Sequence, residues 1–185
     1  KKYVSNKVAI DLYAGPSEVM VVTNNKENVS IAAIDALSQL EHGTDSCAFV
    51  LSKSKKILNN IKTEIEDLSK KLTRNDLIDE AFKNIIMVKC KSDNDIVDKI
   101  NDCAPEHLVL LDDDFPKYID SINNAGSVFC GNMSPVAFGD YASGTNHVLP
   151  TSGWAKTNSG LSVNDFMKKL SFQKTDNTAF NYLSD

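Results

Sequence analysis

Short apolar runs alternate with amphipathic stretches along this chain, and this alternation restricts its fold more than any other feature. Between the runs, apolar residues recur at the three- and four-residue spacing of helices. Strands that alternate with helices are typical of a parallel sheet covered on both faces. We therefore expect an α/β fold with an open, mostly parallel sheet and helices on both faces. The expected strands lie at residues 18–23, 47–51, 85–89, 108–111 and 127–130.

Helices are expected between and after these strands. Asn25 can cap the first of them, and Gly43 fits its end. The segment 139–150, GDYASGTNHVLP, fits neither hydrophobic period, so we expect an ordered loop there. Further helices are expected at residues 57–72, 77–82, 93–102, 114–123 and 164–170, and beyond the last of these the sequence loses clear organisation.

Composition excludes several classes of protein. The chain has 185 residues, which suits one domain, and its net charge of -5 argues against nucleic acid or anionic membrane as a partner. No run is apolar enough to span a bilayer, and no signal peptide is recognisable. The four cysteines are far apart and form no CxxC pair, so we expect no disulfides and no thiolate zinc site. We expect a cytoplasmic protein, and the opening KKYVSNKVAID suggests a piece of something larger.

The three histidines lie in polar, turn-flanked contexts. Asp140 and His147 belong to the expected loop, and both are side chains often used for metal binding and proton transfer. A glutamate directly precedes each of the other two histidines, as in Glu106-His107 at the mouth of an expected strand. Ligands of open α/β sheets bind at strand ends, although usually at the carboxyl ends. A solvated surface loop remains an alternative for 139–150.

Two other segments present polar side chains with competing explanations. The turn at Gly15-Pro16 presents Ser17 and Glu18, and a turn serine often bonds only its own backbone. Gln39 and His42 are three residues apart, so they share a helix face. A histidine that complements the dipole at a helix C-terminus would explain His42 equally well.

Several segments together resemble the histidinol dehydrogenase family, in its order and at its spacing. They are IDLYAGPSEV (10–19), DALSQLEHGTDS (35–46), NDCAPEHL (101–108) and AGSVFCGNMSPVAFGDYASGTNHVLPT (125–151), followed by GLSVNDF (160–166) where the family has SLSxxDF. The resemblance implies a Rossmann-like sheet that is incomplete relative to the family. It also implies an α/β catalytic portion at 1–155 and the start of a C-terminal connecting segment at 156–185.

The resemblance implies a zinc- and NAD-dependent oxidation of L-histidinol to L-histidine through histidinaldehyde, the last step of histidine biosynthesis, in a homodimer. His107 would take the hydroxyl proton as hydride leaves, and Glu106 would activate the water needed for the second oxidation. No residue of this chain is assigned to NAD. The implied zinc ligands are Gln39, His42 and Asp140, and the implied substrate contacts are Ser17, Gln39, His42, His107, Asp140 and His147. Glutamine is an uncommon zinc ligand, so Gln39 is assigned by the resemblance alone.

The chain departs from the family in length. It lacks the front portion that carries most of the NAD-binding surface and a C-terminal segment that supplies another zinc-binding histidine. We therefore expect this chain to have no dehydrogenase activity by itself. Two alternatives remain: a zinc hydrolase in which Glu106 activates metal-bound water, although no HExxH is present, and a non-catalytic domain that binds an imidazole compound or a partner subunit.

Overall fold

The computed structural model describes residues 3–4, 6–8, 10–13, 15–71 and 82–184. Five strands form one sheet in the order β3-β2-β1-β4-β5, and every neighbouring pair is parallel. The expected α/β fold with a parallel sheet is therefore confirmed. The strands are β1 (Glu18–Val22), β2 (Cys47–Ser52), β3 (Ile85–Lys89), β4 (His107–Leu110) and β5 (Ser127–Cys130).

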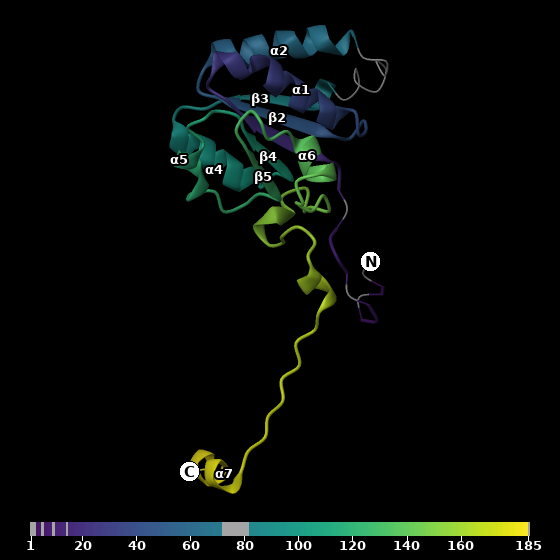
Figure 1. Ribbon diagram of the computed structural model, residues 1–185, viewed down its shortest axis with the longest axis vertical. Helices are drawn as coiled ribbons and strands as arrows, with labels where there is room; N and C mark the ends of the chain where they lie inside the picture. The colour runs from purple at the N-terminus through teal and green to yellow at the C-terminus, as the bar shows by residue number, and fades with distance from the viewer. Residues whose placement is uncertain (1–2, 5, 9, 14, 72–81, 185) are drawn as a thin grey trace.

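Helices cover both faces of this sheet (Figure 1). On one face lie α1 (Val29–Leu40) and α2 (Lys55–Ser69), and on the other lie α4 (Asp93–Cys103) and α5 (Pro116–Ile119). The central strand β1 is buried on both sides, with Val19 and Val21 in the α1–α2 core and Met20 and Val22 in the α4–α5 core. Burial on both faces explains why the sequence of β1 is a nearly continuous apolar run.

Local signals place most helix ends. Asn25 accepts a hydrogen bond from the Glu27 amide and caps a 3-10 turn (Lys26–Asn28) that leads into α1, as expected. The helix ends at Leu40, ahead of Gly43, so His42 follows the helix in a turn and does not belong to its last turn. Its amide still donates to the Gln39 carbonyl, which keeps the two residues close.

The expectation of a loop throughout 139–150 is wrong at its start, because α6 (Val136–Tyr141) includes Asp140. This short helix depends on tertiary packing. A Cβ at Gly139 would lie 2.6 Å from the Phe129 ring, so the glycine lets α6 approach β5 closely. Val136 packs against the α1–α2 core. Residues 142–150 are irregular, as expected.

The C-terminal expectations are also partly wrong. The expected helix at 164–170 is a 3-10 turn (Val163–Phe166), and its apolar side chains are exposed, so no core supports a longer helix. Beyond it an extended segment leads away from the sheet to α7 (Asn177–Leu183), which Asp176 caps (Figure 1). In place of 114–123, α5 spans four residues. Most of the expected helix at 77–82 lies outside the described residues, and a 3-10 turn (Phe82–Asn84) follows.

Three segments meet at the amino edge of the sheet. They are the residues before β1, the start of β4 and the end of α1. Because β1 and β4 are neighbours in register, Val19 faces His107, and the segments that precede both strands lie side by side. This edge carries the candidate site. In the described part of the chain, no helix has the length and apolar character needed to cross a membrane.

Candidate active site

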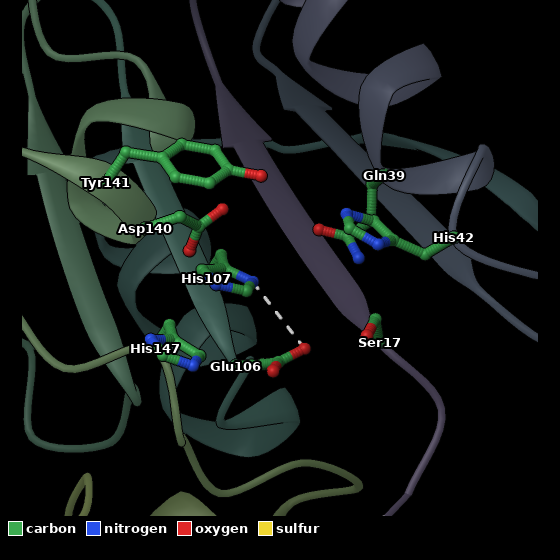
Figure 2. A pocket seen from close by; sticks show the side chains of 8 residues that line it. All are labelled: Ser17, Gln39, His42, Glu106, His107, Asp140, Tyr141 and His147. Carbon is green, nitrogen blue, oxygen red and sulfur yellow. Dashed lines mark ion pairs between the residues drawn. The ribbon is translucent and has the colours of Figure 1, made fainter.

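Segments far apart in the sequence bring all the predicted site residues to one cavity of about 320 Å³ (Figure 2). The structure thus places them together, and their individual roles remain predictions. Because parallel strands, unlike hairpins, bring distant segments together, only the folded sheet assembles this set. The cavity is lined by Ser17, Gln39, His42, Glu106, His107, Asp140, Tyr141 and His147.

His107 is the buried imidazole at the first position of β4, with 7% of its surface exposed. Its Nδ1 lies 3.2 Å from the backbone carbonyl of Glu18. A carbonyl oxygen can only accept, so this contact favours the tautomer with hydrogen on Nδ1 and a lone pair on Nε2. Burial lowers the pKa of His107 below its ordinary value, which favours the neutral ring. The side chain is thus prepared to accept a proton at Nε2.

Glu106 is the buried carboxyl group directly before His107, with 6% exposed. Burial raises the pKa of Glu106 to about 7, and the negative charges of Glu18 and Asp140 act in the same direction. Its Oε2 accepts a hydrogen bond of 2.9 Å from the Glu18 amide and lies 3.5 Å from His107 Nδ1. A carboxyl group that titrates near neutral pH suits general acid–base chemistry.

The candidate metal donors surround the same cavity. Figure 2 shows Gln39 and His42 on one side and Asp140 on the other. Gln39 is buried, and among the described residues its Nε2 has no hydrogen-bond partner, so this nitrogen can still donate to a further group. Nitrogen and oxygen donors of this kind fit zinc. Within residues 3–71 and 82–184, leaving out the undescribed positions, no three His, Cys, Asp or Glu side chains are close enough to hold a metal. The donors therefore fit zinc by type, and the set of Gln39, His42 and Asp140 contains only two side chains of these four kinds.

Two residues of this region were given no role from the sequence. Tyr141 lines the cavity from the end of α6, with 89% of its surface exposed, and it directly follows Asp140. Glu18 is a buried carboxyl group at the start of β1, next to Ser17. The sequence did offer one indication for Glu18, because it is an acidic residue at the start of an otherwise apolar strand. Its contacts with Glu106 and His107 were not predictable from spacing.

Gly126 holds the backbone of Glu106 by close packing. A Cβ at this position would lie 2.5 Å from the Glu106 carbonyl oxygen, which itself accepts a hydrogen bond from the Ser127 amide. We expect Gly126→Ala to destabilise the chain by about 1 to 3 kcal/mol, measured by urea unfolding. Gly43→Ala is the control, because the nearest atoms to its Cβ would be the movable side-chain oxygens of Asp45 and Ser46. Equal midpoints for the two variants would contradict this account.

Comparisons with known proteins agree with the motifs. A family model described as histidinol dehydrogenase matches residues 1–185. The chain is 43% identical over 167 residues to a histidinol dehydrogenase from Bacteroides fragilis (strain YCH46), which covers 90% of this chain and 39% of that protein. A Methanocaldococcus jannaschii histidinol dehydrogenase is 39% identical over 185 residues, or 43% of its length.

A solved structure gives the same result for the fold. The crystal structure of histidinol dehydrogenase from Elizabethkingia anophelis aligns with a TM-score of 0.91 and 40% identity, over 99% of this chain and 42% of that chain. The chain therefore spans only about two fifths of the length of these relatives.

Proposed function

This chain belongs to the histidinol dehydrogenase family, and we propose that it supplies the acid–base residues for NAD-linked oxidation of L-histidinol to L-histidine in a longer protein. One observation carries the proposal. A neutral imidazole and a carboxyl group with a pKa of about 7 lie side by side on the wall of the cavity that also holds the candidate metal donors. The oxidation of an alcohol to an acid needs both a base for the hydroxyl proton and a base for water.

In the first oxidation, His107 Nε2 takes the hydroxyl proton of L-histidinol while hydride leaves the carbon that bears this hydroxyl group. The Glu18 carbonyl stabilises the protonated ring through Nδ1. Histidinaldehyde then adds water: the Glu106 carboxylate takes a proton from that water as the carbon–oxygen bond forms, and protonated His107 gives its proton to the aldehyde oxygen, which restores the neutral imidazole. His107 again removes a hydroxyl proton, now from the hydrate, and the second hydride leaves to give L-histidine. Ser17 and His147 line the cavity where the substrate would lie.

Zinc would be held by Gln39, His42 and Asp140, where it would act as a Lewis acid that orients the substrate. The site lies beyond the C-terminal end of α1, where the unpaired carbonyls of a helix favour a cation. Gln39 would contribute its Oε1 to zinc, because the side-chain nitrogen is a donor and cannot be a metal ligand.

NAD would be the oxidant, and the residues of this chain do not fit it at the usual place. Dinucleotides bind at the carboxyl edge of open α/β sheets, where the order of strands reverses. In this sheet the cavity at that edge is lined by Asn24, Asn25 and three carboxylates, at positions 112–114, which would repel a pyrophosphate. We therefore propose that NAD contacts lie mainly outside residues 1–185.

The longer protein is also proposed to be a homodimer. Exposed apolar side chains of the C-terminal segment, such as Phe166 and Phe172, support contact between this segment and another surface. Sedimentation velocity of the longer protein tests this, and a monomer would contradict it.

The proposed activity is tested by NADH formation with L-histidinol and zinc. The chain by itself is expected to give none. In a second protein, this chain replaces the matching segment of the Bacteroides fragilis relative. This exchanged full-length protein is expected to form NADH. That relative without exchange is the positive control, and circular dichroism verifies that the exchanged protein is folded. A folded, zinc-loaded exchange protein without turnover would contradict the proposal. Imidazole-compound binding by that protein would then favour the non-catalytic alternative, and turnover without NAD would favour the hydrolase.

A further inference from the structure

Glu18 contacts both proposed catalytic side chains through its backbone. Its amide donates to Glu106 Oε2 at 2.9 Å, and its carbonyl oxygen accepts from His107 Nδ1 at 3.2 Å. The first contact fixes the carboxyl group, and the second selects the tautomer of the imidazole. Any shift of the Glu18 peptide groups would therefore disturb both residues together.

The side chain of Glu18 ties this backbone to a second segment. Its Oε1 accepts a hydrogen bond from the Ser152 amide. Ser152 has a φ of 55°, a left-handed conformation that a serine adopts only when its surroundings hold it there. The two segments also pack closely, because a Cβ at Gly15 would overlap the Thr151 and Ser152 hydroxyls. The carboxylate thus fastens the start of β1 to the turn at 151–153.

We propose that Glu18 is a positioning residue: its carboxylate, anchored on Ser152, holds the backbone that orients Glu106 and His107 and places a negative charge beside Glu106. This inference rests on the proposed function for its catalytic meaning. The geometric part of the proposal is that the hydrogen bond to the Ser152 amide holds the backbone of residue 18. The electrostatic part is that the buried charge acts on Glu106. The two parts can be separated by experiment.

The electrostatic part has support from the groups around Glu106. Burial raises the pKa of Glu18, and the bond to the Ser152 amide opposes that rise, because it favours the ionised form. The charged or titratable groups that act on Glu106 are Glu18 from β1 and Asp140 from α6, and His107 lies beside it on β4. Cys47 from β2 is also coupled to Glu106, and burial raises the pKa of its thiol to about 11, which keeps it neutral.

Two variants of Glu18 separate these parts. Glu18→Gln keeps an oxygen that can accept from Ser152 and removes the charge, so the Glu106 pKa is expected to fall below about 7 while His107 keeps its tautomer. Glu18→Ala removes both, so the peptide groups of residue 18 lose the side-chain anchor to Ser152 and keep the strand pairing with β2. In the exchanged full-length protein, Glu18→Ala is expected to lower kcat by about 100-fold, because small misplacements of reacting groups have effects of that size. Glu18→Gln is expected to keep most of the kcat that Glu18→Ala loses.

The decisive measurement does not require turnover. Carboxyl ¹³C NMR titration of the metal-free chain gives the Glu106 midpoint, assigned with Glu106→Gln, and imidazole ¹⁵N shifts give the His107 tautomer. Glu27→Gln is the control, since it removes the same charge from an exposed position. We expect a lower Glu106 midpoint in Glu18→Gln and mixed His107 tautomers in Glu18→Ala only.

An unchanged Glu106 midpoint in Glu18→Gln, together with an unchanged tautomer in Glu18→Ala, would overturn the inference. The expected NMR changes in a protein that shows no turnover would support the positioning by Glu18 and count against the proposed function instead. The near-isosteric Glu18→Gln keeps the test valid if Glu18→Ala fails to fold.

Discussion

His107→Asn is expected to lower the rate of L-histidinol oxidation by the exchanged full-length protein by a factor of about 10² to 10⁴, the usual contribution of a general base. An asparagine amide can replace Nδ1–H as the donor to the Glu18 carbonyl, so the strand end should keep its structure. It offers no atom that can take up the hydroxyl proton. The loss should therefore appear in kcat, with KM nearly unchanged, in steady-state measurements of NADH formation.

His147→Asn provides the comparison for this variant. His147 is exposed where it lines the cavity, whereas His107 is buried and contacts the Glu18 carbonyl through Nδ1. We expect its replacement to raise KM and to change kcat much less. Similar kcat values for the two variants would contradict the assignment of His107 as the base.

Glu106→Gln is expected to leave the first oxidation intact and to slow the second. Oxidation of the alcohol needs only His107, so one NADH per L-histidinol should still form. Activation of water needs the carboxylate, so histidinaldehyde should accumulate, with its further oxidation slowed by a factor of about 10² to 10⁴. Trapping the aldehyde and counting NADH per substrate measures both effects. Two NADH per substrate at the unaltered rate would contradict the role given to Glu106.

The pH dependence gives an independent reading of the same residue. The ionised carboxylate is the base, and the pKa of Glu106 is raised to about 7, so aldehyde oxidation should rise as the pH increases through about 7. An unburied glutamate would place this rise nearer its ordinary pKa of 4.5. Glu106→Gln should show no rise in this range. A rise that persists in the variant would assign the titration to another group.

The strands were predictable from the sequence because burial dictates their composition. β1 packs a core on each face, so all five of its residues are buried, and the expected run differs from the strand by one residue. Capping at Asn25 was likewise readable. In contrast, α6 was missed because its formation depends on Gly139 meeting the Phe129 ring, a tertiary contact between α6 and β5. Local periodicity contains no record of such contacts.

The site divides along similar lines. Motifs that resemble the family selected the side chains around the cavity, and the fold brings all of them together. Residue type alone would not have selected Gln39, since an amide is an uncommon zinc ligand. The role of Glu18 was hidden because it acts through its own peptide groups, whose positions depend on the pairing of β1 with β4. Glu106 and His107 lie at the amino end of β4, as their position before the expected strand indicated, and not at the carboxyl end where such folds usually bind ligands.

The pairing of β1 with β4 also determines when this site exists during folding. The bonded groups of Glu18 and Glu106 are 88 positions apart in the chain, and the described residues between them include β2, β3, α1, α2 and α4. The entropy of closing so long a loop grows only slowly with length, by about 0.6 kcal/mol per doubling, but non-local parallel pairing forms slowly. An intermediate that contains only β1, α1, β2 and β3 would carry Gln39 and His42 without Glu106 or His107. The time at which ligand binding returns during refolding would therefore report when β1 pairs with β4. This pairing is expected well after most of the helices have formed.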